Sequence, residues 1–513
     1  MPTTTTQKNI QEIERPPVVV VLGHIDHGKS TLLDYIRKTN TTEKEVGGIT
    51  QHISAYEVEH KAKDGTGKRI TFLDTPGHAA FTKMRKRGAN LADVAIVVVS
   101  AEDGVKQQTL EVLTMLKENN MPYIIAINKT DRPNANVEKI KQELAEHEVL
   151  VEGYGGDIPV VSISAKTGAG IEELLEMMLL VAELQELKGN TNLPAEGVVV
   201  ESHVDPREGV SATLIIKNGT LKREMYIAAD TALAPVRRID AFLNHNAEEA
   251  TFSSPVLLTG FNTTPQVGVS FKSFKTKKEA AAHIKEQSQI KTAPQSGTQQ
   301  EEEDNPESSE ISEHVIPVVI KADTTGSLEA LGHEIEKLEG ETKTFKIIHR
   351  GVGNIEEGDL KFASSGKHTI ITGFNVSVGK PAEKAALQHD LAIKTFSIIY
   401  ELIEWLSEEI KKRTPKITVE EETGTAKIMK TFSKAKGKQV VGGKVLTGEL
   451  TVPGKIKIAR RGNEIDKGEI VELQQQKAKT KSVKDGFEFG AMIESKHDIA
   501  AGDTIEAFTL VEK

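Results

Sequence analysis

Hydrophobic residues in the first 190 positions gather in short continuous runs, and segments with a helical period separate these runs. Apolar runs without alternation predict strands that are buried on both faces, as in a mostly parallel sheet with helices on either side. Ligands on such sheets bind at the carboxyl ends of the strands. The pattern therefore predicts an α/β domain over residues 16–190, with buried strands near residues 18–22, 69–74, 93–99, 123–127 and 158–163.

After residue 190 the pattern changes to short alternating strands with glycine turns, which predicts a small antiparallel β-barrel over residues 191–276. A weak repeat links this region to the end of the chain. Gly219-Thr220-Leu221 followed by Ile227-Ala228 recurs as Gly448-Glu449-Leu450 followed by Ile458-Ala459. The repeat predicts a second, related β-barrel over residues 415–513. The alternative is that unrelated strands share the same hairpin pattern.

The region between the two barrels has three parts. Residues 277–313 are rich in Gln, Ser and Glu, which predicts a flexible linker. Strand–helix alternation returns over residues 314–395 and predicts an α/β/α domain. Gly326 stands before a helix and could mark an anion site, but no base-reading motif accompanies it, so we interpret this domain as structural or coupling. Residues 396–414 carry a wide apolar stripe that ends in a cluster of cations, which predicts a linker helix.

Composition narrows the classes of function. The 513 residues include no cysteine, which excludes disulfides, thiolate catalysis and Cys-based zinc sites. Residues 1–15 are polar and predict a disordered tail, and no apolar run is long enough to span a bilayer, so we expect a cytoplasmic protein with no membrane contact. The formal net charge is −10, but residues 427–484 hold 15 Lys or Arg against 5 Asp or Glu. This local excess favours nucleic-acid contact over a merely solvated face.

A phosphate-binding loop follows the first predicted strand. Residues 23–30 read G-x-x-x-x-G-K-S between that strand and a helical segment. The glycines permit backbone angles that turn N–H groups inward, and the helix presents its positive end to phosphates. Lys29 is expected to reach the β- and γ-phosphates, and the Ser30 hydroxyl to bind Mg²⁺. The whole loop is a predicted site: Gly23, His24, Ile25, Asp26, His27, Gly28, Lys29 and Ser30.

Three more strand ends carry polar segments that suit a guanine nucleotide. Asp74 is expected beside the magnesium ion, and the Gly77 N–H beside the γ-phosphate. Asp131 can accept two hydrogen bonds from guanine, which adenine cannot supply, and the Ala165 N–H suits the guanine O6. Each segment alone could be a structural turn, but all of them in this order on one sheet predict a guanine-nucleotide site. The segments are Asp74-Thr75-Pro76-Gly77-His78, Asn128-Lys129-Thr130-Asp131 and Ser164-Ala165-Lys166.

The segment Gly47-Gly48-Ile49-Thr50-Gln51-His52-Ile53 follows the first helix. A threonine there can bind Mg²⁺ through its hydroxyl while its N–H holds the γ-phosphate. Such a segment is ordered by GTP and released on hydrolysis. Ser30, Thr50 and Asp74 are therefore the predicted magnesium ligands.

These segments resemble the translational GTPases, and among them the bacterial translation initiation factor two family. The resemblance covers almost the whole chain from Pro16, without the long N-terminal extensions frequent in that family. It implies that His78 positions the attacking water, with Ile25 and Ile49 as apolar gate residues beside it. No cis arginine finger is evident, so hydrolysis is expected to be slow until a partner completes the site.

The resemblance also implies a function. The chain would place formyl-methionyl initiator tRNA on the small ribosomal subunit, promote joining of the large subunit and hydrolyse GTP, with GTP and Mg²⁺ bound and with the free protein a monomer. The helix at 396–414 would be a rigid arm, and the last domain would hold the tRNA. Gln474-Gln475-Gln476-Lys477 departs from the family's K-R-F-K, and Gly443 and Phe489 stand where the family has cysteines. The pocket for the formyl group is therefore not assigned.

Two other functions stay open from the sequence. One is a different translational GTPase, either an archaeal or eukaryotic-type subunit-joining factor or an elongator-tRNA carrier. The other is a ribosome-binding scaffold that does not hydrolyse GTP.

Overall fold

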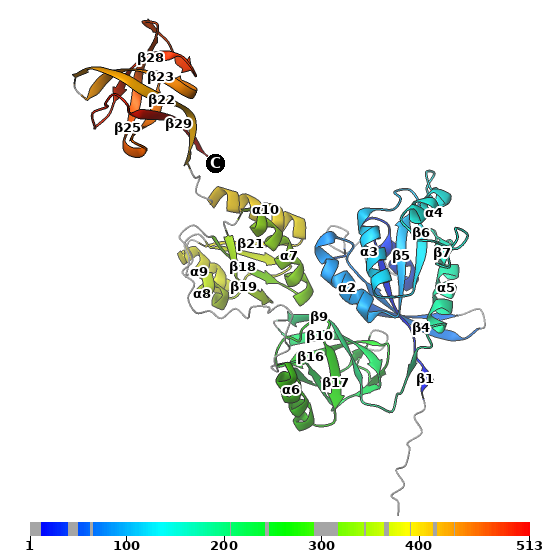
Figure 1. Ribbon diagram of the computed structural model, residues 1–513. Coiled ribbons are helices and arrows are strands. Elements are labelled where there is room, and N and C mark those ends of the chain that lie inside the picture. The colour runs from blue at the N-terminus through cyan, green and yellow to red at the C-terminus, as the bar shows by residue number, and fades with distance from the viewer. Residues whose placement is uncertain are drawn as a thin grey trace, which may run out of the picture. The chain divides into compact units, whose positions relative to one another are not determined.

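The computed structural model describes residues 12–38, 50–61, 65–205, 207–241, 246–291, 316–342, 345–363, 369–389, 391–413, 418–435 and 437–512. The chain forms two compact units, Met1–Arg413 and Thr414–Lys513. The first unit contains three domains and the second contains one (Figure 1). The predicted fold class is confirmed: an α/β domain, a β domain, a second α/β domain and a C-terminal β domain.

The first domain is a six-stranded sheet in the order β3-β4-β2-β5-β6-β7, parallel except for β3. Successive residues of β2 point to opposite faces, so Val18 and Val20 join one hydrophobic core and Val19 and Val21 join the other. Helices α2, α3 and α4 cover the first face, and α1 and α5 cover the second. The strands are β2 (Val18–Gly23), β3 (Ser54–Lys61), β4 (Gly67–Asp74), β5 (Val94–Ser100), β6 (Tyr123–Asn128) and β7 (Val160–Ser162), and the helices are α1 (Lys29–Arg37), α2 (Thr82–Leu91), α3 (Gln107–Glu118), α4 (Val137–Glu146) and α5 (Ile171–Glu183).

The end of the predicted N-terminal tail belongs to the fold. β1 (Ile13–Glu14) pairs with β8 (Lys188–Gly189), and Arg15 makes a bidentate ion pair with Asp93 at 2.7 Å. The prediction of a disordered tail is wrong for residues 12–15, because these contacts fix their backbone. Residues 1–11 lie outside the described part of the chain.

The second domain is antiparallel, as predicted, with the strand order β13-β12-β17-β9-β10-β16-β14 and a separate pair of β11 with β15. Its alternating apolar residues enclose one hydrophobic core. The strands are β9 (Glu196–Asp205), β10 (Gly209–Asn218), β11 (Thr220–Lys222), β12 (Tyr226–Ala229), β13 (Ala232–Pro235), β14 (Asp240–Ala241), β15 (Glu249–Thr251), β16 (Pro255–Phe261) and β17 (Ser270–Phe274).

Helix α6 (Lys277–Lys291) corrects the predicted linker at 277–313. The helix packs on β12, β13 and β17, and Ala280 is fully buried. The Thr276 hydroxyl accepts the Glu279 amide while the Glu279 carboxylate accepts the Thr276 amide, which caps the helix reciprocally. Composition alone missed this capping box. Residues 292–313 of the predicted linker lie outside the described residues.

The third domain is a parallel sheet in the order β19-β18-β20-β21, with α7 and α10 on one face and α8 and α9 on the other. It is the expected α/β/α arrangement. The elements are β18 (Ile316–Ala322), α7 (Thr325–Thr342), β19 (Phe345–Val352), α8 (Glu357–Ala363), β20 (Ile370–Phe374), α9 (Lys380–His389), β21 (Ala392–Phe396) and α10 (Ile399–Arg413).

Helix α10 is shorter than the predicted linker helix, because Phe396 ends strand β21 and the helix begins at Ile399. Its apolar stripe is buried against the third domain through Ile399, Leu402, Leu406 and Ile410. The helix is thus a structural part of the third domain.

The C-terminal unit is a closed β-barrel. The strands follow the order β22-β29-β24-β25-β28-β23, and β22 also pairs with β23, so the sheet closes on itself around one core. The strands are β22 (Thr418–Ala435), β23 (Lys438–Thr451), β24 (Gly454–Arg460), β25 (Asn463–Gln475), β26 (Ala478–Lys479), β27 (Ser482–Lys484), β28 (Glu488–Glu494) and β29 (Thr504–Glu512).

The predicted repeat has a structural counterpart in both β domains. In the second domain β12 pairs with β17, which follows Gly268, and in the last domain β24 pairs with β29, which follows Gly502. Both glycines have positive φ, +86° and +101°. In each domain, therefore, the strand that holds the repeated Ile-Ala pair is hydrogen-bonded to a strand that follows a glycine with positive φ.

Candidate functional site

The loop between β2 and α1 depends on its two glycines. Gly23 has φ +144°, and a Cβ there would lie 2.4 Å from the Val98 carbonyl oxygen. Gly28 has φ +89° and directly precedes the first turn of α1. Glycine is therefore required at both ends of the loop. The loop and the start of α1 line a cavity of about 290 Å³, together with Thr50, Gly77 and His78.

Lys29 lies across the loop. Its ammonium group donates to the carbonyl oxygens of Gly23 at 3.1 Å and His24 at 2.8 Å. Burial lowers the pKa of Lys29 to about 8, and the nearby carboxylate of Asp74 acts in the opposite direction. A Cβ at Gly77 would lie 2.5 Å from the Lys29 Nζ, so the glycine permits this close approach. The arrangement places a buried cation at the wall of the cavity.

The two predicted hydroxyl ligands of magnesium are neighbours. Ser30 Oγ and Thr50 Oγ1 are 3.0 Å apart, and Asp74 ends the adjacent strand β4. Hydroxyl and carboxylate oxygens are donors that Mg²⁺ accepts, with the remaining positions taken by phosphates and water. Within the described ranges no group of three or more His, Cys, Asp or Glu side chains could hold a metal by itself. The donor set thus fits an ion that arrives with a nucleotide.

His78 begins the turn after β4. Its Nδ1 accepts the Ala80 amide at 2.7 Å, which caps the 3₁₀ turn η2 (Ala79–Phe81). Its ring lies against Tyr400 of α10, with centroids 4.1 Å apart and an interplanar angle of 72°. Burial lowers the pKa of His78, so the neutral imidazole carries its proton on Nε2.

Arg85 holds the same turn from α2. Its guanidinium donates to the carbonyl oxygens of Pro76 and His78, and burial lowers its pKa to about 10. Thr75 anchors the other side by donating to the Val21 carbonyl oxygen at 2.9 Å. Sequence reasoning found Thr75 but missed Arg85, because an arginine in a basic helical segment carries no sign of burial.

Two histidine side chains stabilise the loop between β2 and α1. His27 is buried, and its Nδ1 lies 3.3 Å from the Val98 carbonyl oxygen. Burial lowers the pKa of His27 to about 4, so the ring is neutral and donates to that oxygen. The His24 ring meets it edge-on at 5.0 Å. Both side chains therefore brace the loop, whereas Ile25 and Asp26 line the cavity.

Asn128 joins the phosphate loop to the predicted base-reading segments. Its Nδ2 donates to the His27 carbonyl oxygen at 2.8 Å, and its Oδ1 accepts the Ala165 amide at 2.9 Å. The amide that the sequence analysis assigns to guanine O6 is thus engaged by Asn128 in this structure. A base would have to share or replace that contact.

Asp131 is exposed and oriented by Ser164, whose hydroxyl donates to Oδ1 at 2.7 Å. This hydrogen bond lowers the pKa of Asp131, so the carboxylate is ionised and can accept donors. Thr130 donates to the Ile163 carbonyl oxygen, and Lys129 pairs with Asp103 at 2.9 Å. Lys166 is exposed beside them. The structure brings both predicted base-reading segments together at the ends of β6 and β7.

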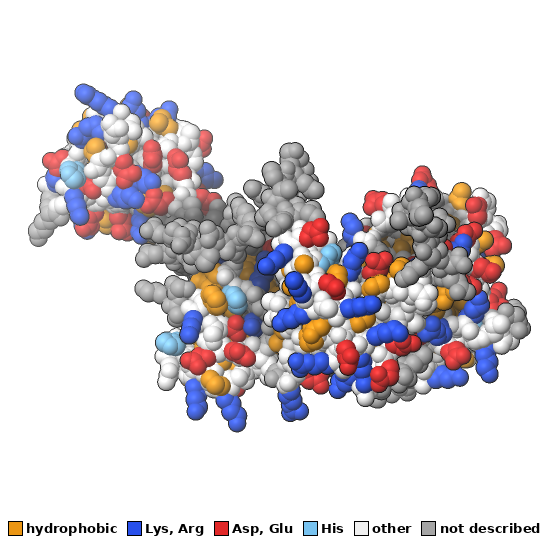
Figure 2. Space-filling view, turned by 90° about the horizontal axis from the view of Figure 1, so that it is seen from below, with side chains coloured by type: hydrophobic (Ala, Val, Ile, Leu, Met, Phe, Trp, Pro, Cys, Tyr) orange, Lys and Arg blue, Asp and Glu red, His pale blue; other side chains and the backbone are white. Residues whose placement is uncertain are grey.

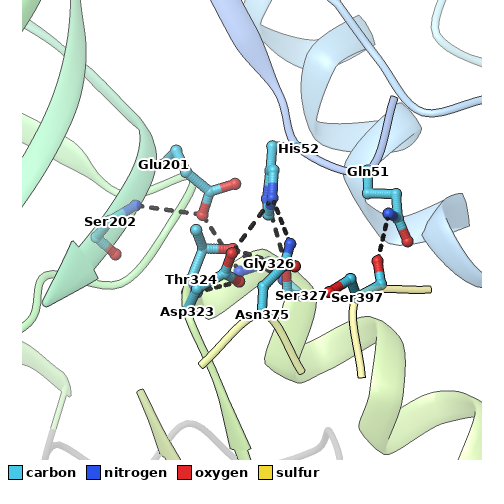
Figure 3. A network of polar contacts seen from close by, with 10 residues as sticks. All are labelled: Gln51, His52, Glu201, Ser202, Asp323, Thr324, Gly326, Ser327, Asn375 and Ser397. Carbon is cyan, nitrogen blue, oxygen red and sulfur yellow. Dashed lines mark hydrogen bonds and ion pairs between the residues drawn. The ribbon is translucent and has the colours of Figure 1, made fainter. Parts of the chain in front are cut away.

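The segment that contains Gly47, Gly48 and Ile49 lies outside the described residues, so the predicted gate is described only at Ile25. The described part resumes at Thr50, and the next two residues contact the third domain (Figure 3). Gln51 Nε2 donates to the Ser397 carbonyl oxygen at 2.9 Å. His52 Nε2 lies 3.3 Å from Asp323 Oδ2. These contacts were not predicted from the sequence.

All three domains of the first unit meet at the start of α7. The Glu201 carboxylate on β9 accepts the amide of Gly326 at 3.2 Å (Figure 3). Burial raises the pKa of Glu201 to about 7. At Gly326, where the sequence left an anion site open, the amide is bound by the carboxyl group of a second-domain side chain. This contact agrees with a coupling role for the third domain.

The basic segment of the last domain is partly neutralised by acids from neighbouring strands. In Figure 2 the visible face of this domain, at the upper left, shows Lys and Arg mixed with Asp and Glu. The count over residues 427–484 therefore overstates the free charge. The cations in ion pairs include Lys434, Lys438, Lys457, Arg460, Lys467 and Lys479.

The outer surface of β22 and β23 keeps exposed cations and apolar side chains together. Lys427 and Lys444 lie directly opposite each other on β22 and β23, although Glu488 lies beside Lys444 on β28. Like charges at such positions repel each other, and an anion would relieve the repulsion. Met429 and Phe432 on β22 are 57% and 62% exposed next to them.

The structure also shows the surroundings of the residues that differ from the pattern of the family that this chain resembles. Gly443 and Phe489 are cross-strand neighbours, and a Cβ at Gly443 would lie 2.9 Å from the Phe489 ring. The phenyl ring thus fills the space at Gly443. Gln476 and Lys477 both have positive φ and form the two-residue turn between β25 and β26.

Among the described residues, no helix is long and apolar enough to cross a membrane.

Family comparisons cover three parts of the chain. The family model for the elongation factor Tu GTP binding domain matches residues 14–183. The model for elongation factor G domain 2 matches residues 194–274, and the model for translation-initiation factor 2 matches residues 288–407. The first domain is therefore a GTP-binding domain.

Relatives that match almost the whole of this chain are named translation initiation factor IF-2. The chain is 42% identical over 506 residues to translation initiation factor IF-2 of Persephonella marina, covering 98% of this chain and 57% of that protein. It is 38% identical over 507 residues to that of Rubrobacter xylanophilus, covering 98% and 72%. The crystal structure of GDP-bound aIF5B from Aeropyrum pernix aligns with 26% identity over 96% of this chain and 92% of that chain, at a TM-score of 0.46.

Proposed function

We propose that this chain, which belongs to the translation initiation factor IF-2 family, binds GTP in the cavity at β2 and α1, delivers initiator tRNA and hydrolyses GTP on the ribosome. The chain spans 57% to 72% of the length of the two relatives above, so these activities are proposed for the part in hand. The observation that carries the proposal is the cavity itself, which brings Lys29, Ser30, Thr50 and His78 together.

Nucleotide binding would use groups that are already in place. The phosphates would lie at the start of α1, where backbone N–H groups and the helix dipole favour anions. Lys29 would exchange its two carbonyl acceptors for phosphate oxygens, and this exchange favours its charged form. The guanine would be read by Asp131, with Asn128 and Ala165 completing the pocket. Rejection of adenine follows, since adenine would leave the carboxylate unpaired.

Ser30, Thr50 and Asp74 would hold Mg²⁺ together with the phosphates. The ion, when bound, neutralises charge on the phosphate oxygens. Thr50 would then be drawn toward the nucleotide, and the following residues Gln51 and His52 would carry this change to their contacts on the third domain.

In hydrolysis, the oxygen of a water molecule forms a bond to the γ-phosphorus as the bond to the β–γ bridging oxygen breaks, giving GDP and inorganic phosphate. His78 would orient that water from the end of the turn held by Arg85. Ile25 and Ile49 would flank the approach. No other residue is assigned to the reaction, so the ribosome is expected to complete the site.

The C-terminal barrel would hold formyl-methionyl initiator tRNA on the outer surface of β22 and β23. Support comes from the exposed Lys427 and Lys444 beside Phe432, because cations contact phosphates and aromatic rings stack on unpaired bases. The remaining partners are the small and large ribosomal subunits, which implies a cytoplasmic place of action.

The experiment is phosphate release from GTP by the purified chain with both ribosomal subunits, with and without initiator tRNA. Stimulation of phosphate release by the subunits supports the proposal. Its absence would favour a ribosome-binding scaffold that does not hydrolyse GTP. Filter binding of formylated against unformylated initiator tRNA separates this family's function from that of a subunit-joining factor or an elongator carrier. The packed third domain already disfavours the elongator carrier.

A further inference from the structure

The first turn of α10 forms part of the wall of the nucleotide cavity. Ile399 and Tyr400 line it together with Lys29, Thr50 and His78. Just before the helix, the Ser397 carbonyl oxygen accepts the Gln51 side chain at 2.9 Å. One short segment of the third domain therefore contacts both loops that flank the nucleotide, one on each side.

Tyr400 is not explained by the core of its own domain. The residues of α10 that bury against the third domain are Ile399, Leu402, Leu406 and Ile410, whereas Tyr400 is 49% exposed. Its ring instead meets the His78 ring at 4.1 Å and 72°, across the boundary between two domains. This edge-on geometry is the favoured one for aromatic pairs.

His78 is held from two directions as a result. The Ala80 amide fixes its Nδ1 at 2.7 Å, and Tyr400 covers its ring. Both contacts oppose rotation of the imidazole ring. Ala80 belongs to the same turn and moves with His78, so withdrawal of α10 would remove only the Tyr400 contact and would ease that rotation.

We infer that Tyr400 is a positioning residue that holds His78 in a resting orientation, and that withdrawal of α10 releases the histidine for hydrolysis. The inference rests on the proposed function, since it concerns the same histidine that would position the attacking water. It gives a physical cause for the slow hydrolysis that is expected away from the ribosome.

The test compares Tyr400→Leu with Tyr400→Phe, and with Glu404→Ala as a control one turn further along α10, where the side chain is exposed. Tyr400→Leu removes the aromatic ring, while Tyr400→Phe keeps it. With Tyr400→Leu, GTP turnover without ribosomes should rise about 3- to 10-fold, from the loss of one aromatic pair. The ribosome-stimulated rate should stay unchanged. Tyr400→Phe and Glu404→Ala should both match the wild type.

A second measurement does not depend on turnover. In ¹H–¹³C spectra of the imidazole groups, the His78 signal is assigned by its loss in His78→Gln. It should move toward the position of an exposed histidine in Tyr400→Leu and stay in place in Tyr400→Phe. An unmoved His78 signal, or a basal rate that is unchanged or reduced in Tyr400→Leu, would overturn the inference. If the wild type shows no ribosome-stimulated hydrolysis at all, the proposed function fails instead, and the spectra still report whether Tyr400 holds the ring.

Discussion

The Glu201 carboxylate of the second domain accepts the amide of Gly326 in the third, at 3.2 Å, and so caps helix α7 across a domain boundary. The acid is almost fully buried, with Asp323 and Arg87 as the charged groups that act on it most. An ionised carboxylate would suit the helix start, but burial opposes its charge more strongly and raises the pKa to about 7.

The sign of the resulting pH dependence follows from that raised pKa. In the unfolded chain Glu201 titrates near its ordinary value of 4.5, so between pH 4.5 and 7 the folded protein binds the extra proton. The stability contributed by this group is complete below pH 4.5 and is lost as the pH rises through 7, amounting to about 3 kcal/mol. The melting temperature of Glu201→Gln relative to that of the wild type should therefore be higher at pH 8 than at pH 5. Equal shifts at both pH values, or a shift in the exposed control Glu208→Gln, would count against this role.

His78 is the residue on which hydrolysis should depend most. His78→Ala should keep GTP binding, because the phosphate and base contacts lie elsewhere, and should lose about 100-fold or more of the ribosome-stimulated rate. The measurement is single-turnover phosphate release at saturating GTP. His147→Ala, at an exposed histidine of the same domain, serves as the control. Retained hydrolysis in His78→Ala would remove the assigned role.

The paired hydroxyls of Ser30 and Thr50, 3.0 Å apart, predict how the site depends on magnesium. Chelation with EDTA should weaken GTP binding to the wild type. Ser30→Ala should show weakened binding in the presence of Mg²⁺ and little further change on chelation, because the ion has lost a ligand. Thr82→Ala, on an exposed threonine at the start of α2, is a matched control. A Ser30→Ala protein as responsive to EDTA as the wild type would contradict the ligand assignment.

Lys427 and Lys444 should contact phosphates of the bound tRNA. Lys427→Gln with Lys444→Gln should weaken tRNA binding at low salt and reduce the slope of log K against log salt by about 1 per lost contact. Lys479→Gln removes a cation that is paired with Glu472 and should change the slope less. Identical slopes in the double variant and the wild type would place the tRNA elsewhere.

Much of this architecture could be predicted from short sequence patterns. The buried valines of β2 and the glycines around Lys29 define a strand, a loop and a helix locally, so the phosphate-binding loop follows from contiguous residues. Contacts between distant segments could not be predicted in this way. Neither Tyr400 nor Arg85 carries a local sign of its partner, and Glu201 reads as an ordinary polar residue in an alternating strand.

Errors in the predictions have a similar cause. Residues 277–291 have the composition of a solvated linker, yet the cap between Thr276 and Glu279 and the burial of Ala280 make them a helix on the second domain. The charge count over residues 427–484 ignored acids such as Glu420 and Asp503, which the barrel closure brings beside the cations.

The claim on which the account rests is that guanine is selected by Asp131, which follows β6 and lies outside the residues that line the cavity. The measurement is competition for bound, labelled GDP by GTP, ATP and xanthosine triphosphate. GTP should displace the label and ATP should fail by several powers of ten. Asp131→Asn should prefer xanthosine triphosphate, because its amide donates where the carboxylate accepts, while the exposed control Asp157→Asn should behave as the wild type. Displacement by ATP at the same concentrations as GTP would contradict the account.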